Sequence, residues 1–144
     1  MAHAKGGPAL VLQLLVYPAV DGTLGFPSIH ENGQGYLLTQ DSINYYYNHY
    51  VPAGTDRKQV LLSPIYAESF IGLPPAHIMT AEFDPLRDEG EAYAAKLQAA
   101  GVPVTCTRYE GMIHAFFSLA GMLDQGKKAI EEAATALRAA FDPR

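Results

Sequence analysis

Asp84 and His114 are the residues of this sequence whose types and spacing best suit proton-transfer chemistry. Asp84 follows the apolar run at residues 76–83, and His114 lies a few residues after the alternating run at residues 102–109. A carboxylate that hydrogen-bonds an imidazole fixes its tautomer and stabilises the imidazolium that forms when the ring takes a proton from a nucleophile. The pair therefore has the residue types of the second half of a Ser-His-Asp relay.

Each residue also has a simpler interpretation. Asp84 directly precedes Pro85, and an aspartate followed by proline is a good start for a helix, with the aspartate as N-cap. A histidine in a loop is often only solvated. Position alone leaves the catalytic and the simpler interpretations of both residues open.

The surrounding pattern predicts strands alternating with helices. Residues 9–17, 76–83 and 102–109 have the apolar or alternating patterns of strands. The apolar periodicity predicts a helix from Pro85 to Gly101 and a last helix striped by Leu123, Ile130, Ala134, Leu137 and Phe141. This order indicates an α/β fold with a parallel sheet, in which one strand-helix-strand unit brings Asp84 and His114 together at the carboxyl edge.

The remaining segments contain many turn-forming residues. Residues 21–38 are expected to form a loop, after which Thr39 caps a helix that continues to about Tyr50. Residues 52–75 are expected to be irregular, and residues 110–113 to form a loop. Residues 1–5 have the pattern of the end of a helix.

Composition excludes several classes of protein. With 49% hydrophobic residues, the 144-residue chain can bury a core as one globular unit, and a formal charge of −5 argues against nucleic-acid binding. No apolar run approaches the roughly 18 residues of a membrane span. The single cysteine, Cys106, rules out an internal disulfide and fits a cytoplasmic protein; its place in the strand pattern predicts a buried, inert thiol. Neither a metal site nor a cofactor site is expected.

The segment 72–90, GLPPAHIMTAEFDPLRDEG, closely resembles the hormone-sensitive-lipase-like family of α/β-hydrolases, which includes many bacterial carboxylesterases. Shorter matches extend this resemblance over nearly the whole chain, at residues 16–18, 35–39, 63–64, 99–104 and 109–116. The resemblance implies that Asp84 is the triad acid and His114 the triad base. Ala115 departs from the family, which usually has glycine beside the base.

Two further family motifs are absent from these 144 residues. The family nucleophile lies in a G-x-S-x-G elbow upstream of the acid. No serine of this chain lies in such an elbow; the serines are Ser28, Ser42, Ser63, Ser69 and Ser118. The H-G-G-G oxyanion loop is also absent. By resemblance, residues 1–144 therefore correspond to the C-terminal part of an α/β-hydrolase catalytic domain.

The family architecture also implies a partly helical cap, and residues 21–60 fit its insertion after the first strand. Aromatic walls suit an ester with an apolar acyl chain. The residues expected to contact such a substrate are Tyr45 and Tyr46 in the cap and Phe116 and Phe117 beside the base.

These observations predict a carboxylic ester hydrolase that acts on small-molecule esters and is inactive without a serine from a missing N-terminal half. The alternative is a non-catalytic, degenerate hydrolase module that provides a binding or assembly surface. The strands at residues 9–17 and 102–109 are expected to be the two open edges of the sheet. Self-association, or pairing with the missing half, is therefore expected.

Overall fold

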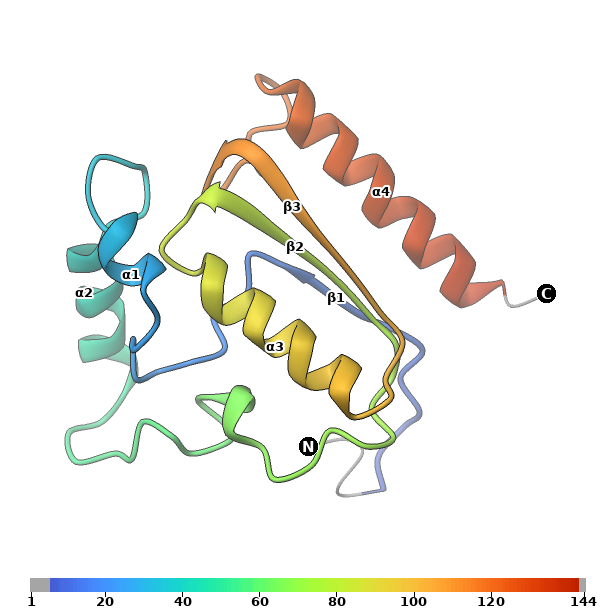
Figure 1. Cartoon of the computed structure of the whole chain (residues 1–144), viewed down its shortest axis with the longest axis horizontal. Helices are drawn as coiled ribbons and strands as arrows, with labels where there is room; N and C mark the ends of the chain where they lie inside the picture. The colour runs from blue at the N-terminus through green and yellow to red at the C-terminus, as the bar shows by residue number, and fades with distance from the viewer. Residues whose placement is uncertain (1–5, 143–144) are drawn as a thin grey trace.

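The computed structural model describes residues 6–142, which surround a three-stranded parallel sheet (Figure 1). Strands β1 (Gln13–Val16), β2 (Ala76–Phe83) and β3 (Val104–Ile113) lie in the order β1-β2-β3. Gln13 is opposite Ala76 in the first pair of strands, and Ala76 is opposite Val104 in the second. The predicted α/β architecture and the predicted strand at 76–83 are confirmed. The helix predicted at residues 1–5 lies outside the described residues.

Helices cover both faces of the sheet. Successive residues of a strand face opposite sides, and neighbouring Ile78 and Met79 of β2 belong to separate core clusters. Ile78 lies in the cluster that contains Leu97 of α3 (Arg87–Ala99), and Met79 in the one that contains Ala129 and Ala133 of α4 (Asp124–Phe141). Both helices run alongside the sheet in Figure 1. The sheet and its two cores hold the strand ends in place.

The first strand is shorter than the predicted 9–17. Only Gln13–Val16 pairs with β2, and Leu10 and Val11 before it are 57% and 48% exposed. The partner strand begins at Ala76 because the preceding residues are Pro74 and Pro75, which have no N–H to donate to a ladder. The apolar run therefore begins before Gln13, but β2 offers no residues to pair with that earlier part.

The third strand, by contrast, extends through residues 110–113, which were predicted to be loop. Its pairing with β2 is irregular there, because Ala81 pairs with Tyr109 but Phe83 pairs with Ile113. Gly111, at φ +74°, lies in this bulge and donates its N–H to the Glu82 carboxylate over 2.7 Å. As a result, His114 directly follows the last residue of β3.

Residues 21–75 form a long insertion between β1 and β2. It contains α1 (Ser28–Glu31), inside the predicted loop, then α2 (Gln40–Tyr50) and the short 3₁₀ helix η2 (Pro64–Tyr66). The Thr39 side chain accepts a hydrogen bond from the Ser42 N–H, so the predicted cap of α2 is confirmed. Figure 1 shows α1 and α2 beyond the carboxyl ends of the strands. No helix among the described residues is long and apolar enough to cross a membrane.

Two predictions about burial are wrong. The buried face of α4 is formed by Gly126, Ala129 and Ala133, whereas Ile130 and Phe141 of the predicted stripe are 44% and 72% exposed. A Cβ at Gly126 would lie 2.5 Å from the Phe116 carbonyl oxygen, so α4 packs on its smallest residues. Cys106 is exposed rather than buried, because it lines an open cavity beside α3 with Glu91 and Arg108.

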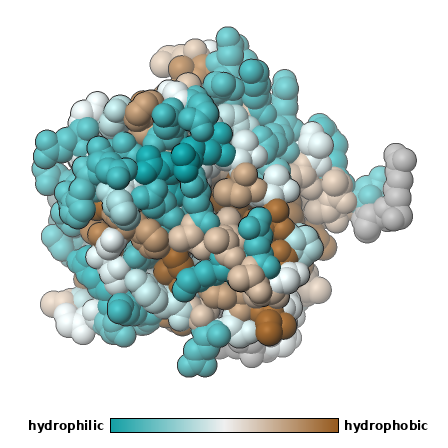
Figure 2. Space-filling view, viewed as in Figure 1, coloured by the Kyte–Doolittle hydropathy of each residue, from teal (hydrophilic) through white to brown (hydrophobic). Residues whose placement is uncertain are grey.

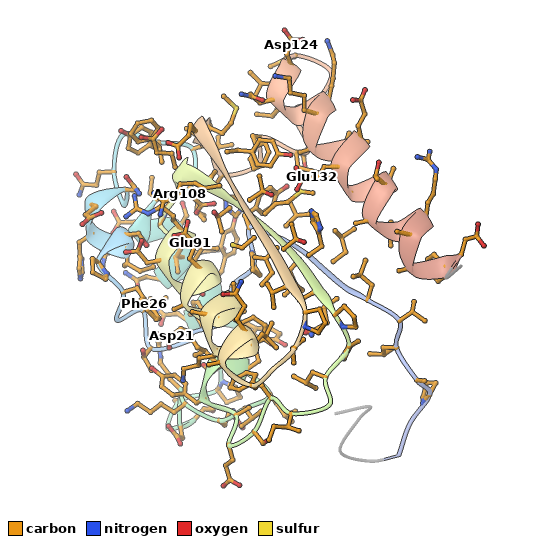
Figure 3. The ribbon with its side chains drawn as sticks, turned by 45° about the vertical axis from the view of Figure 1, so that its right-hand side comes forward. Asp21, Phe26, Glu91, Arg108, Asp124 and Glu132 are labelled. Carbon is orange, nitrogen blue, oxygen red and sulfur yellow. The ribbon has the colours of Figure 1, made fainter. Side chains whose placement is uncertain are left out.

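The exposed surface mixes apolar and hydrophilic side chains. Figure 2 shows brown apolar patches reaching the surface among teal side chains on one face of the molecule. On the sheet, Glu132 of α4 accepts hydrogen bonds from His77, Thr107 and Tyr109, and these contacts tie α4 to β2 and β3 (Figure 3). These hydrogen bonds help to hold α4 in place although its buried face is made of small residues.

Candidate active site

The structure brings Asp84 and His114 into direct contact. Asp84 immediately follows β2 and His114 immediately follows β3, so the parallel pairing of the strands places both at the same edge of the sheet. The His114 Nδ1 and Asp84 Oδ2 atoms are 2.7 Å apart. An imidazole held in this way at Nδ1 keeps Nε2 available for proton transfer.

Asp84 acts on two partners with different oxygens. Its side chain is buried, and while Oδ2 contacts His114, Oδ1 accepts the Leu86 N–H over 2.8 Å. The second contact closes a turn just before α3. The helix begins at Arg87, with Leu86 as its N-cap and no side-chain cap, so the predicted N-cap role of Asp84 and the predicted helix start at Pro85 are wrong. The one carboxylate therefore orders this turn with Oδ1 and orients the imidazole with Oδ2.

The imidazole of His114 is held on one face and at one edge. The Tyr17 ring packs against it with 4.4 Å between centroids, and 21% of the His114 side chain is exposed. Within residues 6–142, no hydrogen bond to Nε2 is formed, and none of the five serines contacts it. Nε2 is thus the ring nitrogen left for a reacting group.

A buried glutamate lies next to this pair. Glu89 of α3 is fully buried, and its Oε1 accepts the backbone N–H groups of Val20 over 2.6 Å and Asp21 over 3.0 Å. Its Oε2 has no hydrogen-bond partner among the described residues. Burial is the main reason that the pKa of Glu89 rises to about 7, and the nearby Asp21 and Asp84 carboxylates raise it further. Sequence reasoning missed this residue, although it lies in the D-P-L-R-D-E-G run.

An open cavity of about 440 Å³ adjoins His114. It lies between the imidazole and the 21–62 segment, and its lining is mostly apolar: Ala19, Leu38, Ile43, Tyr46, Tyr47, Tyr50, Leu61, Leu62, Leu86 and His114. Burial raises the pKa of Tyr47 to about 12, so its phenol stays neutral near pH 7. The cavity can accept an apolar group beside the imidazole.

The four aromatic residues predicted to contact substrate occupy different places. Tyr46 lines the cavity, whereas Tyr45 does not, is 61% exposed and packs on His49. Phe116 is fully buried in the core beneath α4, where its ring packs on Tyr109, so its prediction as a substrate contact needs correction. Phe117 is half-buried against the same core and is not part of the cavity lining.

Leu61, Leu62 and Leu86 also line the cavity, and sequence reasoning missed them. They lie in irregular backbone or at a helix start, where apolar residues have no periodicity to reveal which side they face. Among residues 6–142, no group of three or more His, Cys, Asp or Glu side chains has the arrangement of a metal site.

Ala115 follows the imidazole with a left-handed backbone, at φ +70°. A Cβ in this region costs about 1–2 kcal/mol, whereas glycine adopts it readily but loses more chain entropy on folding. Ala115→Gly is therefore expected to raise the free energy of unfolding by about 0.5–1 kcal/mol in urea denaturation. Ala95→Gly, in the exposed interior of α3, should instead lower it by about 1 kcal/mol. Equal losses in both variants would contradict the strain at residue 115.

A parallel sheet covered on both faces, with an acid and a base meeting at its carboxyl edge, defines the α/β-hydrolase class. The chain belongs to this family: the model described as alpha/beta hydrolase fold matches residues 1–118. The resemblance to bacterial carboxylesterases of the hormone-sensitive-lipase-like group is thereby confirmed.

Similar proteins are known both by sequence and by structure. The carboxylic ester hydrolase LipN of Mycobacterium tuberculosis is 41% identical over 96% of this chain and 37% of its own length. Carboxylesterase NlhH of the same species is 38% identical over 98% of the chain and 45% of its length. A thermostable esterase from Pseudomonas putida superposes with a TM-score of 0.93 and 40% identity over 99% of this chain and 46% of that one. The chain thus spans less than half the length of these relatives.

Proposed function

We propose that this chain supplies the acid, the base and part of the substrate pocket of a carboxylic ester hydrolase. The observation that carries the proposal is the position of His114, whose Nδ1 contacts the buried Asp84 while its ring lines an apolar cavity. The relatives named as ester hydrolases support the same chemistry.

In this reaction His114 is the proton shuttle. A serine from a segment outside these 144 residues gives its proton to Nε2 as its oxygen attacks the ester carbonyl. The imidazolium, oriented by the Asp84 carboxylate, then returns the proton to the leaving alkoxide. Water repeats the sequence on the acyl-enzyme and releases the carboxylic acid. Donors for the oxyanion also come from that outside segment.

Residues 21–60 act as the cap of this site. Five cavity-lining residues come from this segment, namely Leu38, Ile43, Tyr46, Tyr47 and Tyr50. Such a wall favours small-molecule esters with an apolar acyl or alcohol group over charged ones. In this proposal the chain works in the cytoplasm, since its only cysteine needs no oxidising compartment.

The chain alone is expected to hydrolyse p-nitrophenyl esters no faster than free imidazole does, because His114 has no serine to activate. A serine-directed phosphonate is expected to leave all five serines unlabelled in mass spectrometry. Ser28 and Ser63 are fully buried, and Ser118 contacts the Tyr17 hydroxyl instead of His114. Stoichiometric labelling of any of these serines would show that the nucleophile lies within the chain.

A segment that supplies the nucleophile and the oxyanion donors is expected to give the chain esterase activity. Co-expression with a family segment that carries the G-x-S-x-G elbow and the oxyanion loop is expected to give a complex with esterase activity and to raise the solubility of the chain together with it. The open β1 edge is the expected contact. A complex that forms without any esterase activity would favour the non-catalytic module. If no complex forms, the proposed pairing with an N-terminal half is contradicted.

A further inference from the structure

We propose that Tyr17 is a positioning residue for His114, which it holds by packing its ring against the imidazole. This inference rests on the proposed function, in which His114 is the base. The centroids of the two rings are 4.4 Å apart and their planes are inclined by 51°. Tyr17 comes from the end of β1 and His114 from the end of β3, so the contact joins the two outer strands across β2.

The backbone of Tyr17 is what turns its side chain toward the imidazole. Side chains alternate along a strand, and Leu15 packs in the core on the α3 side, so Tyr17 would be expected on that side as well. Instead, Tyr17 packs with Leu14 and Val16 in the core on the α4 side. Its φ of +39° breaks the alternation, while its N–H still bonds the Met79 carbonyl over 2.7 Å.

This conformation is unfavourable for an aromatic residue, and especially for one that precedes a proline. Such conformations persist where surrounding contacts hold them, and they are common at functional sites. The two non-glycine residues that adopt it nearest the imidazole are Tyr17, which packs on the ring, and Ala115, which follows it.

Three contacts fix the tyrosine ring. Besides the imidazole, it meets Phe116 edge-on with 5.9 Å between centroids, and its hydroxyl is 3.2 Å from the Ser118 Oγ. His114, Phe116 and Ser118 belong to one short segment after β3. Tyr17 therefore contacts the segment that carries His114 at three residues.

The Tyr17 contact restrains a motion of the imidazole that the Asp84 hydrogen bond alone does not restrain. One hydrogen bond at Nδ1 still tolerates small rotations of the imidazole about χ1 and χ2 of His114, and the tilted Tyr17 ring packed against it limits them. Tyr17 thus keeps Nε2 directed at the reaction site.

The test uses NMR of the 144-residue chain and needs no esterase activity. We expect the ring protons of His114 to resonate upfield and to show contacts with the Tyr17 ring in nuclear Overhauser spectra. Tyr17→Phe keeps the stack and should preserve the upfield shift, whereas Tyr17→Leu should abolish it. Loss of the Nδ1-bound proton signal of His114 through faster exchange is expected in Tyr17→Leu only.

A matched control exists in α2, where Tyr45 packs on His49 with 4.2 Å between centroids. Tyr45→Leu should remove the upfield shift of His49 and leave His114 unchanged. If Tyr17→Leu does not fold, the wild-type spectrum decides: no Tyr17–His114 contacts, or unshifted His114 protons, would overturn the proposal. An unchanged His114 spectrum in folded Tyr17→Leu would overturn it too. These outcomes are independent of the esterase and phosphonate assays, so a failure here differs from a failure of the proposed function.

Discussion

His114→Ala and Asp84→Asn are each expected to lower the turnover number about 10³- to 10⁴-fold in an enzyme assembled from this chain and a segment that carries the nucleophile. Alanine removes the group that accepts the serine proton. Asparagine can still accept the Leu86 N–H with its oxygen, but its amide presents N–H donors to Nδ1 and so favours the wrong tautomer of His114. The measurement is kcat for a p-nitrophenyl ester.

Thr39→Ala is the control for a purely structural contact between a side chain and a backbone N–H, because it removes the cap of α2. It should lower the free energy of unfolding by about 1 kcal/mol and leave kcat within the same order of magnitude. If Asp84→Asn kept nearly full activity, Asp84 would serve only the turn before α3, where asparagine can still accept the Leu86 N–H.

Glu89→Gln is expected to stabilise the chain increasingly as the pH rises from 5 to 8. The folded state raises the pKa of Glu89 from 4.5 to about 7, so the carboxyl is favoured in its protonated form. Its contribution to stability is therefore fully present below pH 4.5 and is lost as the pH rises through 7. The full loss is at most about 3 kcal/mol, since one pKa unit corresponds to about 1.4 kcal/mol. Glutamine carries no charge and does not undergo this loss.

Urea denaturation at several pH values checks the effect as the difference between variant and wild type, in which the other titrating groups cancel. Glu132 does not interfere. Burial raises its pKa, but hydrogen bonds from Tyr109, Thr107 and His77 together outweigh burial and lower the pKa, so its contribution is lost only in acid. Glu68→Gln, at an exposed glutamate, is the matched control and should follow the wild type from pH 5 to 8. If the free energy of unfolding of Glu89→Gln changed with pH in parallel with that of Glu68→Gln, Glu89 would be charged in the folded chain.

Local signals predicted the parts of the fold that depend on a residue and its near neighbours in sequence. The strand at 76–83 is bounded by prolines and by Asp84-Pro85, and the cap at Thr39 needs only the Ser42 N–H three residues away. The contact between Asp84 and His114 also follows from local pattern, because one helix joins their strands and the parallel pairing does the rest.

What could not be predicted depends on partners that are distant in sequence. The apolar run at 9–17 gave no information on where its neighbour strand begins, and the periodicity of α4 did not show that the small residues Gly126, Ala129 and Ala133 would face the sheet. The direction of the Tyr17 ring depends on a positive φ, and neither tyrosine nor its neighbours in sequence predict one. Glu89 could not be predicted as a site residue, because its partners are backbone N–H groups, which no side-chain motif marks.

The long insertion between β1 and β2 has a consequence for the order in which the chain folds. β2, α3 and β3 are contiguous from Ala76 to Ile113, whereas the pairing of Gln13 with Ala76 must close a loop that contains the whole insertion. Loop-closure entropy makes local pairings form earlier than distant ones. Asp84 and His114 both belong to the contiguous unit or directly follow it. We therefore expect the acid and the base to meet before the cavity wall forms, so that the insertion docks onto an Asp84–His114 pair that already exists.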